Sequence, residues 1–395
     1  MNISVVGLGY IGLPTAIILG LNEHNVRGFD IDESIVTKLN EGHIHIVEKG
    51  LQPLFEEVIE DGNFKAYSEL QESDIYIISV PTPFREGRAD KVADLSYVEN
   101  AAEMVAEKLK EGDLVILEST VPPGATRRMT DLLAEKSGLS RESFYTAHCP
   151  ERVLPGNIMY EMEHNDRIIG AEREESALKA KELYETFLKG GMIFVTDDVT
   201  AEMCKLVENS YRDVNIAFAN ELSIICDKLK IDTRNLIELA NKHPRVNILS
   251  PGIGVGGHCL AVDPYFITGE FKEESALIDT ARQVNSFKPL YISKRIEDMV
   301  DGNKDAKIAI LGMSYKPDID DFRESPSVIL AKDLIIKGYN VKGCDPNTDR
   351  EMLEGIDMIS LDEALSKADL LVIAQNDREF IERKDEIKER RHFYA

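Results

Sequence analysis

The segment Gly7-Leu8-Gly9-Tyr10-Ile11-Gly12 decides the fold of this 395-residue chain. A short apolar run over residues 2–6 precedes it, and residues 14–21 have the pattern of a helix with proline in its first turn. Glycines at this spacing let a pyrophosphate approach the backbone and let the helix pack closely on the strand, while the helix N-terminus stabilises negative charge. Strand, glycine turn and helix therefore predict a Rossmann-like dinucleotide-binding unit.

An acidic residue at the end of the next predicted strand favours NAD over NADP. Residues 26–29 form that strand, and Asp30 follows it where a carboxylate would bind the ribose. A purely structural glycine turn is the alternative. The predicted cofactor contacts in this part of the chain are Gly7, Gly9, Tyr10, Ile11, Gly12 and Asp30.

Polar residues follow three further predicted strands. Residues 75–80 and 114–118 lead into segments that contain Thr82 and Thr120, and ligands of doubly wound sheets bind at such strand ends. Both threonines are candidates for the cofactor site, and hydroxyls that cap a turn or a helix are the alternative. Glu151 follows a strand predicted near residues 144–147, and either catalysis or a surface salt bridge could explain it.

The segment Gly256-Gly257-His258-Cys259-Leu260-Ala261-Val262-Asp263 places a thiol four residues before a carboxylate. Oxidation beyond an aldehyde is easier when the aldehyde is held as a thiohemiacetal, so Cys259 beside a dinucleotide unit predicts oxidation of an alcohol to an acid. Residues 243–257, rich in glycine and proline, predict a loop whose amides and Arg245 could hold a phosphate. A plain structural loop is the alternative.

Helical spacing dominates the middle of the chain, over residues 201–229, 234–241 and 275–300. Lys205 and Asn209 lie four residues apart and share one helix face, so together they could stabilise an oxyanion. A solvated lysine with a polar neighbour is the alternative.

A second strand, loop and helix unit follows at residues 307–311 and 326–337, with further strands at 341–344 and 370–374. Lys316 and Arg323, in its loop, could bind a phosphorylated ligand or could be surface charges. The predicted fold is α/β, with two Rossmann-like doubly wound sheet domains joined by a central helical segment. The predicted domains are residues 1–198 for NAD, 199–302 for the helical segment and 303–395 for a second ligand.

Composition limits the partners. With 46 basic and 71 acidic residues the formal net charge is −25, which argues against nucleic acid and anionic membranes as partners. The five cysteines lack the paired spacing of a zinc site or disulfide framework, so we expect no metal and a reduced, cytoplasmic setting. The uncharged run over residues 3–21 is interrupted by glycines and Pro14, so neither a membrane span nor a signal peptide is expected.

Taken in order, these motifs resemble the UDP-glucose/GDP-mannose dehydrogenase family over nearly the whole chain. The resemblance rests on Gly7-Leu8-Gly9-Tyr10-Ile11-Gly12-Leu13-Pro14, Ser119-Thr120-Val121-Pro122-Pro123-Gly124, Pro150-Glu151, Lys205 with Asn209, Gly256 to Asp263, and Lys316 with Arg323-Glu324-Ser325. Within the family, residues 243–247 and 257–264 are most similar to those of enzymes that act on UDP-N-acetylmannosamine. Enzymes that act on UDP-glucose usually show a serine before the cysteine and a lysine before the aspartate.

The resemblance implies a four-electron oxidation of UDP-N-acetylmannosamine at C6 to the uronate, with two NAD and one water. The same chemistry on UDP-N-acetylglucosamine or UDP-glucose stays open. Asp263, through a water held with Thr120, would take the hydroxyl proton, and Cys259 would capture the aldehyde. Lys205 and Asn209 would stabilise the oxyanion. Glu151 would assist hydrolysis of the thioester.

Further expectations come from the same resemblance. The helical middle would form a homodimer core, and a contact of Arg245 with the neighbouring subunit's substrate stays open. Lys316 would bind the nucleotide diphosphate or nearby sugar groups, and Arg323 would hold the NAD pyrophosphate. The uronic acid would serve polysaccharide biosynthesis. The substrate contacts implied are Glu151, Arg152, Lys205, Asn209, His243, Arg245, Asn247, Ser250, Gly256 and Lys316.

Two other functions and one structural question stay open. A two-electron 3-hydroxyacid dehydrogenase would share the N-terminal fold but would need neither Cys259 nor a second sheet, and a non-catalytic NAD or UDP-sugar sensor would keep only the loops. Family members usually continue past their final helix into another strand. Here either the residues from Arg390 onward supply that edge strand, or its cofactor contact is absent.

Overall fold

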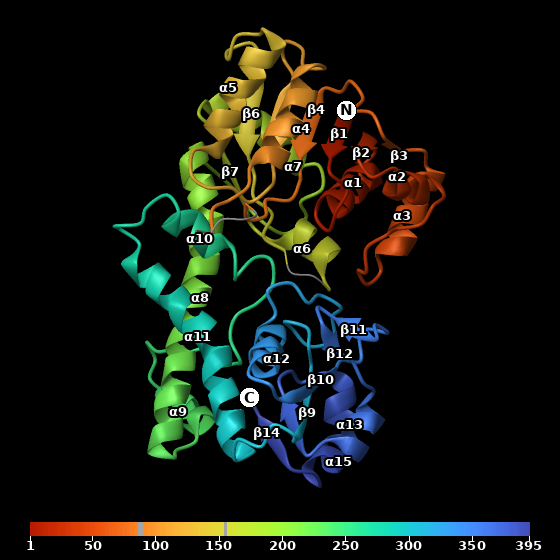
Figure 1. Cartoon of the computed structure of the whole chain (residues 1–395). Helices are drawn as coiled ribbons and strands as arrows, with labels where there is room; N and C mark the ends of the chain where they lie inside the picture. The colour runs from red at the N-terminus through yellow and green to blue at the C-terminus, as the bar shows by residue number, and fades with distance from the viewer. Residues whose placement is uncertain (86–90, 154–155) are drawn as a thin grey trace. The chain divides into compact units, whose positions relative to one another are not determined.

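A computed structural model describes residues 1–85, 91–153 and 156–395 (Figure 1). The chain divides into two compact units, Met1–Val207 and Glu208–Ala395. Each contains a sheet flanked by helices, mostly parallel in the first unit and fully parallel in the second, and the helix α8 (Asp198–Leu229) begins in the first unit and ends in the second.

The first unit is built on an eight-stranded sheet with the strand order β3-β2-β1-β4-β5-β6-β7-β8. All neighbouring strands are parallel except β6 and β7. The order reverses between β1 and β4, and nucleotides bind at such a switch point. The strands are β1 (Asn2–Val6), β2 (Asn25–Phe29), β3 (Phe64–Tyr67), β4 (Ile75–Ile78), β5 (Leu114–Leu117), β6 (Tyr145–His148), β7 (Arg167–Gly170) and β8 (Ile193–Thr196).

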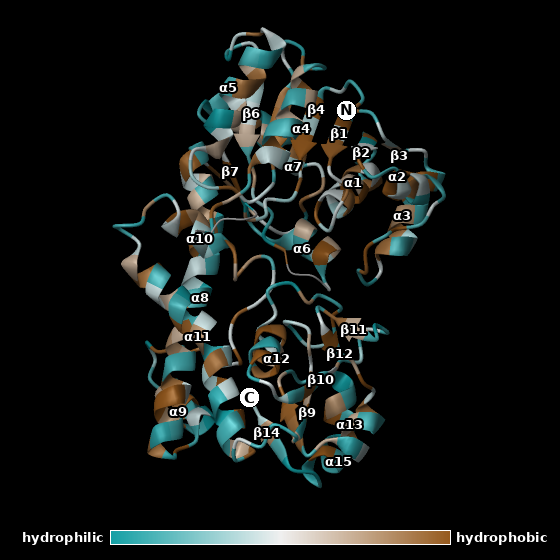
Figure 2. Cartoon of the chain, viewed as in Figure 1, coloured by the Kyte–Doolittle hydropathy of each residue, from teal (hydrophilic) through white to brown (hydrophobic). Residues whose placement is uncertain are grey.

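Helices cover both faces of this sheet because its central strands are apolar on both sides. Alternate residues of β4 pack into different clusters, Ile77 with α1 and α3, and Ile78 with α4 and α5. The brown colour of β1 and β4 in Figure 2 marks these apolar runs. The helices are α1 (Gly12–Leu21), α2 (Glu33–Asn40), α3 (Leu51–Glu60), α4 (Ser96–Ala106), α5 (Ala125–Ser137), α6 (Ile158–His164) and α7 (Glu174–Tyr184).

The second unit combines helices with a four-stranded parallel sheet of order β10-β9-β13-β14. Its strands are β9 (Lys307–Leu311), β10 (Asn340–Cys344), β13 (Leu370–Ile373) and β14 (His392–Tyr394), with a hairpin of β11 (Met352–Leu353) and β12 (Ile356–Asp357). Its helices, besides the end of α8, are α9 (Thr233–Ala240), α10 (Asp263–Thr268), α11 (Ala276–Met299), α12 (Pro326–Ile336), α13 (Leu361–Lys367), α14 (Arg378–Glu382) and α15 (Lys384–Lys388).

The predicted fold class is confirmed. The open question about the end of the chain is also answered, because β14 pairs in parallel with β13, Leu371 opposite His392, and supplies the edge strand. The uncharged run near the N-terminus divides into β1, the glycine turn and the short α1. Within the described part of the chain, no helix combines the length and apolar character needed to cross a membrane.

Candidate functional site

The glycine turn between β1 and α1 has the geometry of a phosphate-binding loop. A Cβ on Gly12 would lie 1.9 Å from the carbonyl oxygen of Gly7, so only glycine fits where the helix meets the turn. A Cβ on Gly9 would meet no atom of the described residues within 4 Å. Among those residues no side chain caps the N-terminus of α1. The helix N-terminus and the open backbone at Gly9 therefore fit a pyrophosphate.

Asp30 closes the other side of this turn. Its Oδ2 accepts a hydrogen bond from the amide of Leu8 at 2.9 Å, and its Oδ1 accepts from the amide of Asp32 at 3.0 Å. A carboxylate has about four acceptor positions, so Asp30 can still accept ribose hydroxyls. Tyr10 is exposed and Ile11 is half-buried beside the turn. These residues fit the NAD expected from the sequence.

The loops after β4 and β5 are tied together. The Thr82 hydroxyl donates to the carbonyl oxygen of Thr120 at 2.8 Å, and the Ser119 hydroxyl donates to the carbonyl oxygen of Val80 at 2.7 Å. The structure thus brings the two predicted threonines next to each other. Their part in cofactor binding and catalysis stays a prediction.

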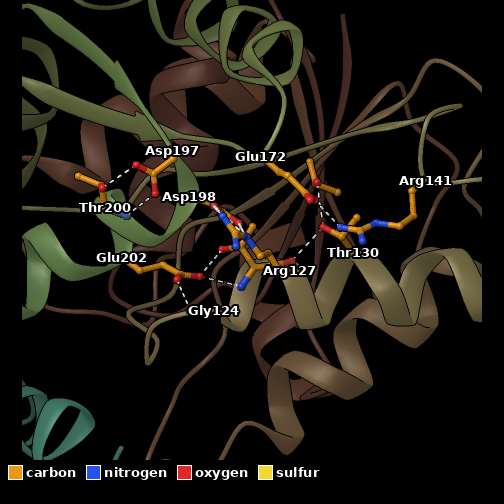
Figure 3. A network of polar contacts seen from close by, with 11 residues as sticks. Gly124, Arg127, Thr130, Arg141, Glu172, Asp197, Asp198, Thr200 and Glu202 are labelled. Atoms are coloured by element: carbon orange, nitrogen blue, oxygen red, sulfur yellow. Dashed lines mark hydrogen bonds and ion pairs between the residues drawn. The ribbon is translucent and has the colours of Figure 1, made fainter. Parts of the chain in front are cut away.

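A buried carboxylate that sequence reasoning missed anchors the end of the second loop (Figure 3). Glu202, in the first turns of α8, accepts hydrogen bonds from the amides of Gly124 at 2.5 Å and Thr126 at 2.7 Å, and from the Thr126 hydroxyl at 2.6 Å. It is 1% exposed, and burial raises its pKa. Lys205 is the third residue after Glu202, so this anchor joins the start of α8 to the loop that carries Thr120.

Glu151 lies in a buried ion pair rather than at the surface. Its Oε2 is 3.0 Å from Nη2 of Arg167, and the two side chains are 7% and 5% exposed. Its Oε1 accepts from the amide of Arg152 at 2.7 Å. The alternative that Glu151 forms a salt bridge at the surface is therefore wrong. The pair is buried because β7, which carries Arg167, pairs with β6, which ends just before Glu151.

Around this pair is a cluster with a second carboxylate. The Arg167 guanidinium carbon lies 4.7 Å from the ring centroid of Tyr184 and 5.2 Å from that of Phe187. Glu118 accepts hydrogen bonds from the Thr15 hydroxyl at 3.0 Å and the Tyr184 hydroxyl at 3.3 Å. Burial, followed by the nearby charge of Glu151, raises the pKa of Glu118. Arg167 and Glu118 were not predicted, because their partners are distant in sequence.

In the second unit the structure brings together three of the predicted catalytic residues. The Asn209 amide donates to Oδ2 of Asp263 at 2.5 Å, and both side chains are buried. The amide of Asp263 donates to the carbonyl oxygen of Cys259 at 2.8 Å, which fixes the cysteine one turn before α10. Cys259 is a half-buried free thiol. Lys205 is half-buried one helical turn before Asn209 on α8.

The cysteine loop is joined to the loop that carries Arg323. The amide of Gly257 donates to the carbonyl oxygen of Arg323 at 3.0 Å, and Nη2 of Arg323 pairs with Oδ2 of Asp321 at 2.6 Å. Oδ2 of Asp321 also lies 3.5 Å from Nδ1 of His258. Hydrogen bonding to Asp321, and then to Cys259, raises the pKa of His258 to about 9. The sequence had assigned His258 no role of its own.

The remaining predicted substrate contacts lie in loops. His243, Arg245, Asn247 and Ser250 are exposed between α9 and α10, Lys316 is exposed after β9, Gly256 is half-buried before Cys259, and Arg152 is half-buried after Glu151. The Asn241 side chain bonds both the amide and the carbonyl of Ile248, at 2.8 and 3.0 Å. The amide of Gly252 donates to the Asn220 side chain at 2.9 Å. The loop therefore has a fixed course with several polar side chains exposed.

The second sheet repeats the nucleotide turn of the first. The amide of Gly312 donates to the carbonyl oxygen of Cys344 at 2.8 Å, as that of Gly7 does to Phe29. Asp345 accepts from the amides of Met313 and Ser314 at 2.8 and 2.9 Å, in the place that Asp30 has in the first unit. Sequence reasoning missed Asp345, although a glycine after one strand and an aspartate after the next were visible signals.

Comparison with known proteins agrees with this geometry. Three family models match consecutive parts of the chain: the NAD binding domain, central domain and UDP binding domain of the UDP-glucose/GDP-mannose dehydrogenase family match residues 1–188, 199–287 and 309–392. Similar curated proteins include an NDP-N-acetyl-D-galactosaminuronic acid dehydrogenase from Ralstonia nicotianae, 46% identical over 390 residues, which are 96% of this chain and 91% of that protein. A UDP-N-acetyl-D-mannosamine dehydrogenase from Campylobacter jejuni is 46% identical over 399 residues, 96% of each.

A solved structure, that of a UDP-D-ManNAc dehydrogenase from Pyrococcus horikoshii, is similar with a TM-score of 0.92 at 41% identity and covers 99% of this chain and 94% of that one. The match includes the unit that carries the dinucleotide turn and the unit that carries Cys259. The chain therefore belongs to the UDP-glucose/GDP-mannose dehydrogenase family and is an NAD-dependent nucleotide-sugar dehydrogenase.

Proposed function

We propose that the protein oxidises UDP-N-acetyl-D-mannosamine at C6 to UDP-N-acetyl-D-mannosaminuronate in a four-electron reaction. The observation that carries this proposal is the cluster of Cys259, Asp263 and Asn209, which unites a thiol, a buried carboxylate and an amide within one unit. A thiol is needed only if the reaction passes the aldehyde. The names of similar proteins support the sugar.

The first oxidation removes the proton and the hydride of the C6 alcohol. NAD, when bound, accepts the hydride in each of the two oxidations. Asp263, through a water held with Thr120, takes the hydroxyl proton. Asn209 holds Oδ2 of Asp263, so the carboxylate keeps one orientation.

The second oxidation takes place on Cys259. The thiol sulfur adds to the aldehyde carbon, and Lys205 and Asn209 stabilise the oxygen of the adduct. Loss of hydride from this thiohemiacetal leaves a thioester. Water cleaves the thioester with help from Glu151 and releases the acid and the free thiol.

Exposed basic side chains would let this acidic protein bind an anionic substrate. Lys316 and Arg245 bind the diphosphate or nearby sugar groups, and Arg323 assists the NAD pyrophosphate. The exposure of these side chains supports ligand binding.

The proposed domains are residues 1–198, 199–302 and 303–395. We place the enzyme in the cytoplasm because none of the five cysteines, all of which lie in the described part of the chain, forms a disulfide.

A homodimer is the proposed assembly, and α8 supplies the observation. Tyr211, Phe218, Ile225 and Leu229 are 64%, 51%, 44% and 63% exposed and recur at intervals of seven and four residues, so they form one stripe along the helix. A large exposed apolar stripe favours a second copy of the chain as its partner. Whether Arg245 reaches the partner's substrate depends on that assembly.

One relative suggests a second sugar. The Ralstonia protein named for N-acetyl-D-galactosaminuronic acid is as similar to this chain as the mannosamine enzymes are. Neither the 3-hydroxyacid dehydrogenase nor the sensor is favoured, since the matches extend over a central and a UDP binding domain.

The substrate proposal is tested by measuring turnover with a panel of UDP-sugars. UDP-N-acetylmannosamine, UDP-N-acetylgalactosamine, UDP-N-acetylglucosamine and UDP-glucose are each supplied with NAD, and kcat/KM is compared. We expect the highest kcat/KM with UDP-N-acetylmannosamine. A higher value with any other sugar would contradict the substrate proposal and leave the chemistry intact.

A further inference from the structure

The cluster around Arg167 contains a cation to which the reaction above gives no role. Nη2 of Arg167 lies 3.0 Å from Oε2 of Glu151 and 3.5 Å from the carbonyl oxygen of Met162. The rings of Tyr184 and Phe187 enclose the guanidinium. The arginine is 5% exposed, so it is shielded from solvent.

A purely structural purpose explains this pair poorly. Desolvation of two charges offsets much of their attraction, and apolar residues of similar volume often serve stability equally well. The Nε of Arg167 is buried without a hydrogen-bond partner among the described residues, which adds a further cost. The arginine therefore directs its Nη2 at Glu151 although its other groups are incompletely satisfied.

The contacts fix the plane of the Glu151 carboxylate. Arg167 holds Oε2, and the amide of Arg152 holds Oε1 at 2.7 Å. These bonds use two of about four acceptor positions, so each oxygen keeps a position for a water molecule. A carboxylate held at both oxygens meets the geometric demand of proton transfer better than one that rotates freely.

The second carboxylate of the cluster does not compete strongly for the same cation. Glu118 accepts hydrogen bonds from Thr15 and Tyr184. Within the described part of the chain it forms neither a hydrogen bond nor an ion pair with Arg167. Burial raises the pKa of Glu118 and favours its neutral form. Glu151 is thus the principal anionic partner of Arg167.

We propose that Arg167 is a positioning residue that orients Glu151 for hydrolysis of the Cys259 thioester. The inference rests on the function proposed above. In that step a water oxygen bonds to the acyl carbon, one water proton passes to Glu151, and the carbon–sulfur bond breaks. The proton on Glu151 then neutralises the departing Cys259 thiolate, so one water is consumed and no further oxidant is needed.

The test compares the full-length wild type with Arg167→Lys, which keeps a positive charge but loses the planar guanidinium. Arg173→Lys is the matched control, since Arg173 lies in the same unit and donates to the carbonyl oxygens of Glu142 and Phe144 rather than to Glu151. UDP-N-acetylmannosamine and NAD are mixed rapidly with each protein. NADH, released acid and the mass of the Cys259 peptide are followed in time, and melting temperatures establish that each variant is folded.

For Arg167→Lys we expect acid release to slow about 100-fold while the first hydride transfer and KM change less than about twofold. A thioester should accumulate on Cys259. Arg173→Lys should resemble the wild type. Equal slowing of both steps without a thioester, or acid release at the wild-type rate, would overturn the positioning role.

Two further variants extend the test, and the first of them replaces Arg167→Lys if that protein does not fold. Glu151→Asp keeps both charges but shortens the reach to Arg167, and it should accumulate the same thioester; normal acid release from it would overturn the proposal. In the folded case, Arg167→Lys added to Glu151→Gln should cause no additional loss, because Arg167 acts through Glu151. A wild type that forms neither NADH nor thioester from any UDP-sugar would instead contradict the proposed function itself.

Discussion

Among single residues, Cys259 is the one whose proposed role distinguishes this reaction from a simple alcohol oxidation. A serine hydroxyl is a poorer nucleophile than a thiol, and its ester is less easily formed and cleaved in this sequence of steps. Cys259→Ser should therefore form acid at least about 100-fold more slowly than the wild type. The rate of uronate formation is the measurement, and Cys226→Ser, at a buried cysteine without an assigned role, is the control. Acid formation at normal speed by a folded Cys259→Ser protein would refute the covalent scheme.

Glu202 offers a prediction about stability. Glu202→Ala would leave the amides of Gly124 and Thr126 without their acceptor, and unsatisfied buried donors cost about 1–3 kcal/mol each. We expect the free energy of unfolding to fall by about 3 kcal/mol in urea titrations. The control Glu103→Ala removes a surface pair with Lys136 and should cost about 0–1 kcal/mol. Equal losses in the two variants would show that Glu202 is not an anchor.

His258 should make the stability of the folded protein depend on pH. Hydrogen bonds to Asp321 and Cys259 raise its pKa from the usual 6.5 to about 9, so the folded protein binds this proton more tightly than the unfolded chain does. The stabilisation that the bound proton contributes is fully present below pH 6.5 and is lost as the pH rises through 9. Titration of the His258 imidazole by NMR should give a pKa near 9 in the wild type and a lower one in Asp321→Asn. An unchanged pKa in that variant would remove Asp321 as the cause.

Among the helices, α8 carries the apolar stripe that we propose as the dimer interface. Phe218→Glu combined with Ile225→Glu would place two charges in the apolar stripe, and charges in a desolvated interface are strongly unfavourable. We expect the dimer to become a monomer in analytical ultracentrifugation. Ile336→Glu is the matched control, because Ile336 is 84% exposed at the end of α12 outside the stripe, and it should remain dimeric. A wild type that sediments as a monomer would contradict the dimer.

How well elements could be predicted depended on whether their pattern is local. The apolar runs of β1, β9 and β13 and the long helices α8 and α11 have a clear period, and the sequence located them closely. The six-residue α10 was missed because it is too short to show a helical period after a glycine-rich loop. The strand predicted over residues 75–80 ends at Ile78, although the amide of Ser79 still donates to the carbonyl oxygen of Val6 at 2.9 Å.

The same distinction applies to the site. The glycine turn, Asp30 and the cysteine segment could be recognised from their spacing in the sequence. The hydrogen bond between Asn209 and Asp263 could not, because the two residues are 54 positions apart. Glu202 and Arg167 could not be found this way, because Glu202 bonds residues 76 and 78 positions away and Arg167 meets Glu151 only through the pairing of β6 and β7. Nothing near them in sequence marks them as more than ordinary charges.

At the scale of the whole molecule, two nucleotide-type turns occur in one acidic chain. Gly7 with Asp30 and Gly312 with Asp345 repeat one arrangement, and the matched family models assign NAD and UDP to these two parts of the chain. With a formal net charge of −25, both anionic ligands must depend on helix N-termini and local cations. The long-range charge of the protein should oppose their approach, so a moderate salt concentration should increase the rate of association rather than decrease it.

In the proposed mechanism, one enzyme oxidises the C6 alcohol of the UDP-sugar to the acid in two steps. The most direct measurement is the amount of NADH formed when UDP-N-acetylmannosamine is limiting and NAD is in excess. The covalent scheme predicts two NADH for each sugar consumed, with the uronate as the product. One NADH per sugar, with an aldehyde as the final product, would contradict it.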